Sequence, residues 1–308
     1  MGKRKVLLCG LLAVAAPAWS QDRLLPPAQL DTAKTYYDAR EALAHPAHVY
    51  RLNIRQQHYY SFPPELCALT NVQFINAMMN NITDVASEVG RLRNLQEINF
   101  RGNKLRSLPA SFFELHNLRS IDFGHNQFTE LPAGYGRLRQ LRVLQLSENL
   151  VRTIAPEVQR LKVLRSLNLS YNQLETLPPQ VGRLRRLRDL ALTQNHLRAL
   201  PASLGRLREL QNLALDYNQL TDLPAQLGQL PELRSLLLAY NQLTVLPETL
   251  TQLPRLELLD LSHNRLSALP ADLGRLRSLR TLILTGNPLP ESEQQRIRRE
   301  LPEASVLF

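Results

Sequence analysis

A single hydrophobic pattern repeats along most of the chain with a fixed spacing of 23 residues. In each copy, leucines or other apolar residues occupy alternate positions before an asparagine, and another apolar residue follows it, as Leu167, Leu169, Asn172 and Leu174 do. The asparagines that keep this register are Asn80, Asn103, Asn126, Asn149, Asn172, Asn195, Asn218, Asn241, Asn264 and Asn287. A fixed period of this length indicates one structural unit stacked many times, with function on a long shared surface.

The alternation within each copy predicts a short β-strand. Residues two apart point the same way, so Leu167 and Leu169 are expected to enter the core while Ser166 and Asn168 face outward. Each asparagine follows where the chain leaves the strand, and its amide can bond backbone groups of its own and neighbouring turns. A later proline, such as Pro178, favours an extended start to the return segment on the opposite, convex side.

The segment 164–186, LRSLNLSYNQLETLPPQVGRLRR, resembles the leucine-rich repeat family because it matches the signature L-x-x-L-x-L-x-x-N-x-L. Its length and its L-P pair are most similar to the repeats of Scribble, Erbin and many bacterial surface or secreted proteins. The resemblance implies an α/β repeat fold, a right-handed leucine-rich-repeat solenoid in the form of an arc. Such a fold has a concave parallel β-sheet and helical caps, and extending the register to Gln57 predicts about eleven repeats in this chain. The resemblance also implies a binding protein or scaffold.

The register divides the chain into four segments. We predict a signal peptide in residues 1–20, an N-terminal helical cap in 21–48, the repeat array in 49–290 and a C-terminal cap in 291–308. The N-terminal cap is expected to be one amphipathic helix from about Ala28 to Leu43, with Leu30, Ala33, Tyr36, Tyr37 and Leu43 on one face. The C-terminal cap is expected to be a helix from about Glu291 to Glu300 and a final strand. Caps shield the two ends of a stacked core.

The first twenty residues have the pattern of an export signal. Lys3, Arg4 and Lys5 precede an apolar run, and Ala18 and Ser20 are small residues at the positions that a signal peptidase reads. We therefore predict cleavage before Gln21 and a protein that is exported, to the periplasm, the cell surface or the medium of a bacterium. The apolar run is shorter than the roughly 20 residues that a membrane span needs.

Basic residues outnumber acidic ones and give a formal net charge of +10. Part of this excess recurs at equivalent positions of the convex segments, in Arg137, Arg139, Arg183, Arg185, Arg206 and Arg208. Stacking would turn these arginines into ridges that either keep a leucine-rich solenoid in solution or attract an acidic polysaccharide or lipopolysaccharide. Nucleic acid is a poor partner, because no base-stacking motif lies between the arginines and the protein is predicted to be exported.

Two groups of side chains on the predicted concave face are candidates for ligand contact. The first is the apolar cluster Phe74, Asn76, Met78 and Met79 of the second repeat, where later repeats carry small polar residues. The alternatives are that the N-terminal cap covers it or that a degenerate repeat has rearranged its core. The second group occupies the position before the asparagine, at Tyr171, Tyr217, Tyr240 and His263. Aromatic rings there suit peptide or sugar contact, although tyrosine is also common at this position in such repeats.

Catalytic motifs are missing from the sequence. No H-E-x-x-H, G-x-S-x-G, P-loop or paired-cysteine pattern occurs. Asp260, Ser262 and His263 lie close together but read as three positions of one strand. We therefore predict a non-enzymatic, exported protein without cofactor or metal, which recognises a protein or peptide through its concave sheet. The alternatives are an envelope glycan-binding module that uses the arginine ridges, or a purely structural scaffold.

Overall fold

The computed structural model describes residues 24–308. The predicted signal peptide and its cleavage site before Gln21 lie outside the described residues. Among residues 24–308, no helix has both the length and the apolar character that crossing a bilayer requires.

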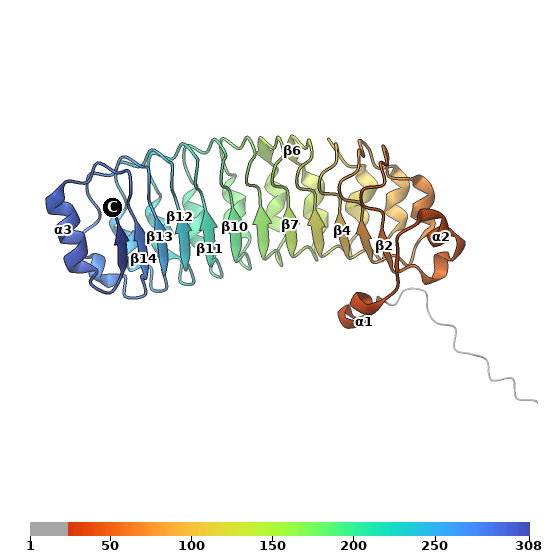
Figure 1. Ribbon diagram of the computed structural model, residues 1–308, viewed down its shortest axis with the longest axis horizontal. Coiled ribbons are helices and arrows are strands. Elements are labelled where there is room, and N and C mark those ends of the chain that lie inside the picture. The colour runs from red at the N-terminus through yellow and green to blue at the C-terminus, as the bar shows by residue number, and fades with distance from the viewer. Residues whose placement is uncertain (1–23) are drawn as a thin grey trace, which may run out of the picture.

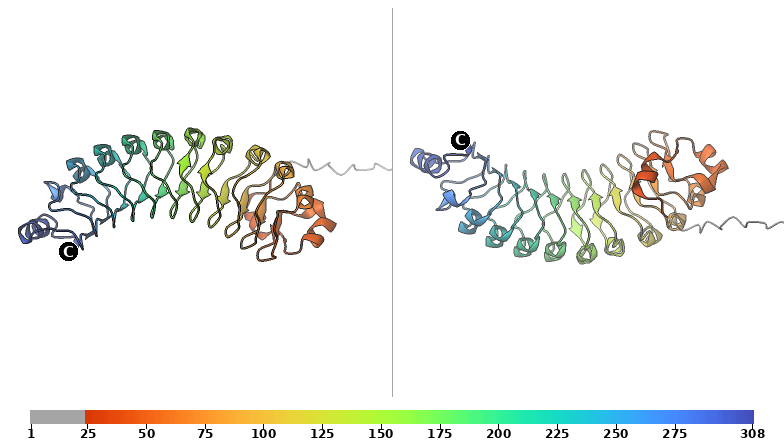
Figure 2. Two further views of the ribbon diagram at one scale, coloured as in Figure 1. Left: turned by 90° about the horizontal axis from the view of Figure 1, so that it is seen from above. Right: turned by 90° about the horizontal axis from the view of Figure 1, so that it is seen from below.

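The protein is an arc-shaped solenoid whose inner side is one parallel sheet of thirteen strands (Figures 1 and 2). Eleven strands come from the repeats and follow one another along the sheet in chain order. They are β2 (Arg51–Asn53), β3 (Phe74–Asn76), β4 (Glu97–Asn99), β5 (Ser120–Asp122), β7 (Val143–Gln145), β9 (Ser166–Asn168), β10 (Asp189–Ala191), β11 (Asn212–Ala214), β12 (Ser235–Leu237), β13 (Leu258–Asp260) and β14 (Thr281–Ile283). Their number confirms the predicted repeat count.

Strand pairing keeps the period of the sequence. Residues 23 apart are partners throughout the array, as in Asp189 with Asn212 and Leu213 with Leu236. The central residue of each strand is buried, because alternate side chains of a strand point to opposite faces. Leucines of successive repeats therefore form continuous columns inside the solenoid, and the core is as long as the sheet.

Short 3₁₀ helices cover the outer, convex side of the arc (Figure 2). Those of the repeats are η2 (Pro64–Ala68), η3 (Ser87–Arg91), η4 (Ala110–Glu114), η5 (Ala133–Arg137), η6 (Pro156–Arg160), η7 (Pro179–Arg183), η8 (Ala202–Arg206), η9 (Ala225–Gln229), η10 (Glu248–Gln252) and η11 (Leu273–Arg275). Most of them begin next to a proline, whose fixed φ holds the chain extended before the turn. A short second sheet, β6 (Glu130–Leu131) with β8 (Thr153–Ile154), lies outside the main one.

Glycine allows neighbouring 3₁₀ helices to pack closely. A Cβ on Gly182 would lie 2.2 Å from the Ser203 carbonyl oxygen, so no larger residue fits there without movement. Phe113 stands in the equivalent position of η4, and the residue that its ring faces is Gly134. The large side chain is thus matched by a missing one in the next repeat. Beside this pair a cavity of about 490 Å³ borders η4 and η5.

The N-terminal cap differs from the single helix expected over 28–43. Its elements are α1 (Pro27–Thr32), β1 (Thr35–Tyr36), α2 (Ala39–Ala44) and η1 (Pro46–His48). The strand β1 pairs with β2, so it covers backbone groups that would otherwise form an open sheet edge. Because strand residues alternate, Tyr36 is buried while Tyr37 is 63% exposed, and the expectation that both lie on one face was wrong.

At the other end, α3 (Glu291–Glu300) and β15 (Ser305–Leu307) close the array. The last strand pairs with β14, and Ile297 of the helix is buried against the core. Arg296 binds Glu293 and Glu300 of its own helix and donates to the Leu269 carbonyl at 3.0 Å. The helix is therefore fixed to the final repeat by both apolar and charged contacts.

Candidate recognition surface

The asparagines form a buried ladder along the edge where the chain leaves each strand. The Asn172 amide donates to the carbonyls of Leu169 at 3.0 Å and of Leu146, in the preceding repeat, at 2.9 Å. Its oxygen accepts from the Val151 N–H at 2.8 Å. The other asparagines of the ladder repeat these contacts, so each joins its turn to the one before. Their role is to satisfy backbone groups inside the fold.

The residue before each asparagine has a left-handed backbone conformation. Its φ is 58° at Tyr171, 55° at Tyr217, 53° at Tyr240 and 51° at His263. Glycine occupies this position in two repeats, at Gly102 and Gly286, and was the signal in the sequence for this conformation. Elsewhere a large side chain accepts an uncommon φ, which interrupts the alternation of the strand. The side chains Met79, His125, Tyr171, Tyr217 and Tyr240 are all exposed at this position.

Three of these side chains form a continuous aromatic stack. The rings of Tyr217 and Tyr240 lie 4.3 Å apart at an interplanar angle of 9°, and those of Tyr240 and His263 lie 4.2 Å apart at 14°. Tyr217 is 50% exposed and Tyr240 42% exposed. Tyr171 is also exposed, but Gln194 separates it from the stack. The structure thus places side by side the three rings that the repeat register brings together.

Apolar residues lie on the strands beside the stack, and the Asp216 carboxylate follows β11. The outward positions of β10 to β12 carry Ala191, Ala214 and Leu237, each partly exposed. Asp216 accepts from the Ala239 N–H at 3.0 Å and from the Thr193 hydroxyl at 3.4 Å. Burial raises the pKa of the Asp216 carboxyl, and these hydrogen bonds oppose the shift only in part.

The neighbouring group of Asp260, Ser262 and His263 does not form a catalytic relay. The Ser262 hydroxyl donates directly to the Asp260 carboxylate at 2.7 Å. The ring of His263 stacks on Tyr240, and within the described chain no hydrogen bond joins it to either of the other two side chains. A serine nucleophile would need the imidazole as its hydrogen-bond partner. In residues 24–308, no three His, Cys, Asp or Glu side chains are grouped so as to hold a metal ion.

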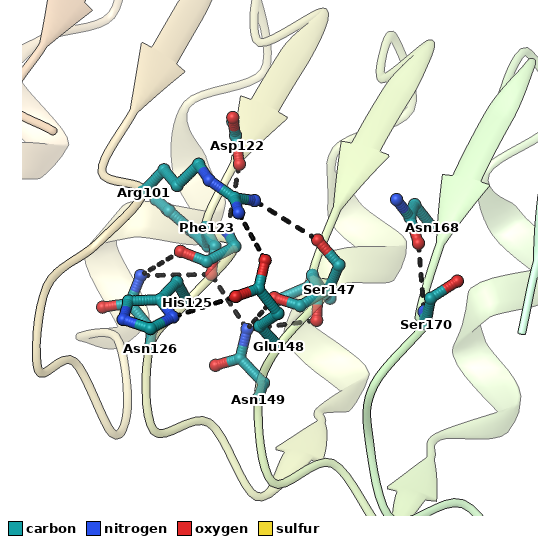
Figure 3. A network of polar contacts seen from close by, with 12 residues as sticks. Arg101, Asp122, Phe123, His125, Asn126, Ser147, Glu148, Asn149, Asn168 and Ser170 are labelled. Carbon is teal, nitrogen blue, oxygen red and sulfur yellow. Dashed lines mark hydrogen bonds and ion pairs between the residues drawn. The ribbon is translucent and has the colours of Figure 1, made fainter. Parts of the chain in front are cut away.

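A charged bridge lies where the chain leaves β4, β5 and β7 (Figure 3). Arg101 reaches across one whole repeat to pair with Glu148, and His125 contacts the same carboxylate at 3.1 Å. Gly124 makes this reach feasible, because a Cβ there would lie 2.5 Å from the Arg101 guanidinium. The Arg101 hydrogen bond lowers the pKa of Glu148, and His125 adds to this shift. The repeat pattern gave no sign of this bridge, because its partners are two repeats apart.

The apolar cluster of the second repeat is partly covered. The Arg51 guanidinium lies 4.2 Å from the centre of the Phe74 ring, and it donates to the Leu30 carbonyl of the cap at 3.4 Å. Met79 remains 53% exposed. Asn76, by contrast, accepts from the Met78 N–H at 3.1 Å and so supports the end of its own strand. Cap and repeat therefore share this corner of the sheet, and Met79 is its most open residue.

The ridge arginines of the sequence prediction follow the 3₁₀ helices on the convex side. Arg137 pairs with Glu114 of the preceding repeat, and the side chain of Arg183 donates to Gln159 at 2.5 Å. All six of Arg137, Arg139, Arg183, Arg185, Arg206 and Arg208 are exposed. They lie apart from the aromatic stack, on the opposite side of the solenoid.

Comparison with known proteins relates both the sequence and the fold to one family. A family model described as "Leucine-rich repeat region" matches residues 49–176. A second, described as "Leucine rich repeat", matches residues 185–243 and 231–289. No curated protein matches the sequence.

Solved structures share the architecture. An internalin (InlF) from Listeria monocytogenes is similar with a TM-score of 0.78 at 21% identity, over 91% of this chain and 82% of that one. The leucine-rich-repeat ectodomain of the plant receptor kinase GASSHO1/SCHENGEN3 from Arabidopsis thaliana, in complex with CASPARIAN STRIP INTEGRITY FACTOR 2, is 30% identical over 83% of this chain, with a TM-score of 0.66. The Arabidopsis receptor kinase HAESA, in complex with the peptide hormone IDA and the co-receptor SERK1, is 30% identical over 74% of this chain, with a TM-score of 0.63.

The chain spans 35% of the GASSHO1/SCHENGEN3 ectodomain and 44% of the HAESA chain. The matched segments of the two family models run almost without a break from the first repeat strand to the last, which is also the extent of the solenoid. This chain belongs to the leucine-rich repeat family.

Proposed function

We propose that this chain is an exported, non-enzymatic recognition module that binds a protein or peptide along its concave sheet, centred on Tyr217, Tyr240 and His263. The observation that carries the proposal is the aromatic stack itself, with ring separations of 4.3 and 4.2 Å and two half-exposed tyrosines. Stacked rings form a rigid surface, so a ligand meets an apolar edge and polar tips that lose little freedom on binding.

The similar plant receptors support a peptide ligand. HAESA was solved in complex with a peptide hormone, and it is 30% identical to this chain over 74% of this chain's length. A parallel sheet with about 4.8 Å between strands offers contacts at regular spacing to an extended chain. The small outward residues Ala191 and Ala214 leave room for such a chain beside the stack.

Charge on the same strands favours a basic ligand segment. Strands β10 to β14 carry Asp189 and Asp260 but neither lysine nor arginine, and Asp216 follows β11, in a chain with a formal net charge of +10. Electrostatic complementarity contributes mainly to partner choice and association rate, so it would select among the peptides that fit beside the stack.

A pull-down from the native envelope and culture medium tests the proposal. Residues 21–308 serve as bait at low and high salt, beside the double variant Tyr217→Ala/Tyr240→Ala. A protein or peptide retained by the parent chain at both salt concentrations, and lost from the variant, supports the concave-face function. Retention of only an acidic glycan or lipid, released at high salt and equal for both baits, overturns it and moves the site to the arginine ridges.

A further inference from the structure

Four arginines surround a small pocket on the flank where the chain enters the strands. The pocket has a volume of about 200 Å³ and is lined by Arg139, Gln140, Arg142, Val163, Arg165 and Arg186. It belongs to three consecutive repeats and lies just before β7, β9 and β10 in sequence. Only Arg139 is shared with the convex ridge. All four arginine side chains are exposed.

Three arginines of the same flank form ion pairs further along the array. Arg188 pairs with Glu209, 21 residues later, at 3.1 Å. Arg234 donates to Glu257 at 2.5 Å, and Arg255 pairs with Glu232. Cross-repeat ion pairs thus neutralise these three arginines in the C-terminal half.

The pocket departs from this arrangement at the acidic position. Arg142 has Val163 where Arg188 has Glu209, and Arg165 has a further arginine, Arg186. Within residues 24–308, no carboxylate lies at ion-pair distance from any of the four guanidinium groups. Four like charges around one small pocket repel one another, and a multivalent anion between them would relieve this repulsion.

We infer that this pocket binds a phosphate or sulfate group. Guanidinium groups bind such oxyanions through paired N–H donors, and their planar fork matches the spacing of two oxygens. The pocket has room for one tetrahedral oxyanion, and its rim is open for the rest of a phosphorylated or sulfated molecule. This site goes beyond the proposed function, because it lies on the flank and uses none of the residues of the aromatic stack.

Titration with inorganic pyrophosphate and with sulfate tests the inference. The ¹⁵N–¹H signals of the arginine side chains are followed by NMR, and affinity is measured by calorimetry. We expect saturable shifts confined to Arg139, Arg142, Arg165 and Arg186, weakening as potassium chloride is raised. Tighter binding of pyrophosphate identifies a phosphate site, and equal or tighter binding of sulfate identifies a site that also accepts sulfate esters.

Matched variants separate a built site from general surface charge. Val163→Glu places a carboxylate beside Arg142, as Glu209 does beside Arg188. We expect Val163→Glu and Arg165→Gln each to weaken pyrophosphate binding about tenfold or more. Arg188→Gln changes an arginine that is already paired with a carboxylate. The affinity of this variant for pyrophosphate should stay within about twofold of that of the parent. Shifts spread evenly to Arg206 and Arg208, or equal affinities for Val163→Glu and the parent chain, would overturn the inference.

Discussion

Phe113 and Gly134 form a complementary pair across two neighbouring repeats. The ring of Phe113 occupies the space that a Cβ on Gly134 would need, at 2.4 Å from its nearest atom. At the equivalent sites of most other repeats the order is reversed, with glycine first and a larger residue second, as in Gly182 and Ser203. Close contact between neighbouring 3₁₀ helices therefore relies in most repeats on a glycine at one of the two facing sites.

This packing rule predicts unequal effects for two glycine substitutions. Gly182→Ala would drive a Cβ into the Ser203 carbonyl, and we expect a loss of about 1 to 3 kcal/mol in the free energy of unfolding. In Gly274→Ala the nearest atom to the new Cβ is the Glu300 carbonyl oxygen, at an ordinary 3.5 Å, so stability should change by less than about 0.5 kcal/mol. Urea unfolding of both variants checks this, and equal stabilities would refute close packing of η7 on η8.

The asparagine ladder predicts a loss of stability without a loss of local strand structure. Asn172→Ala leaves the Val151 N–H without its acceptor, and the Leu146 and Leu169 carbonyls each lose one of two asparagine donors. We expect a cost of about 1 to 3 kcal/mol. Asn168→Ala is the control in the same repeat, because Asn168 only accepts from the Ser170 N–H at 3.0 Å and should cost about 0.5 to 1 kcal/mol. If the melting curves of Asn172→Ala and the parent coincide, the ladder does not stabilise the fold.

The C-terminal cap predicts a pH-dependent contribution from Glu293. Hydrogen bonds from Arg296 and from the Leu269 N–H lower the pKa of this carboxyl. The ionised group therefore stabilises the fold above its ordinary pKa of 4.5, and this contribution is lost as pH falls through the lower value of the folded state.

Accordingly, Glu293→Gln should cost about 1 to 2 kcal/mol at pH 7, and the difference from the parent should disappear in acid. Denaturant unfolding from pH 2 to pH 7 measures both. Glu291→Gln, on the same helix, is the control and should be nearly neutral, because Glu291 bonds only to Gln295 at 3.3 Å. A pH-independent difference for Glu293→Gln would contradict the assignment.

The contribution of Asp216 to stability should change with pH in the opposite direction. Burial raises the pKa of its carboxyl, so the folded protein binds a proton more tightly than the unfolded chain does, and stability falls as pH rises through the raised value. Asp216→Asn keeps an acceptor for the Ala239 N–H and removes this titration. We expect the variant to be at least as stable as the parent at pH 7 and to lack that component of the pH profile. A variant that is less stable than the parent at pH 7 would contradict this account of Asp216.

The regular part of this fold could be predicted from the sequence because each repeat places the same kinds of residue in the same contacts. The strand positions of Leu167 and Leu169, the exit at Asn172 and the number of repeat strands all depend on contacts between equivalent residues, which a period exposes. Tyr217, Tyr240 and His263 could be grouped for the same reason. Their left-handed backbone was missed, although Gly102 and Gly286 at that position were informative.

The remaining features depend on departures from the period. The N-terminal cap has no repeat to constrain it, and β1 forms because the edge of β2 needs a partner, which outweighs the helical pattern of residues 28–43. The bridge from Arg101 to Glu148 needs Gly124 between them, a relationship among three repeats. The arginine pocket arises because Val163 and Arg186 stand at the positions where Arg188 has Glu209. Such non-equivalent contacts were visible only once the repeats were stacked.

The affinity of the ligand recovered from the envelope or medium, measured for a small set of tyrosine variants, tests the central claim most directly. Tyr217→Ala/Tyr240→Ala should weaken binding by about a hundredfold or more while the melting temperature is kept, because truncating an exposed aromatic hot spot costs about 2 kcal/mol or more per residue. Tyr60→Ala, an exposed tyrosine outside the strands of the sheet, should bind as the parent does. Equal affinities for the parent, the double variant and Tyr60→Ala would contradict recognition through the concave face.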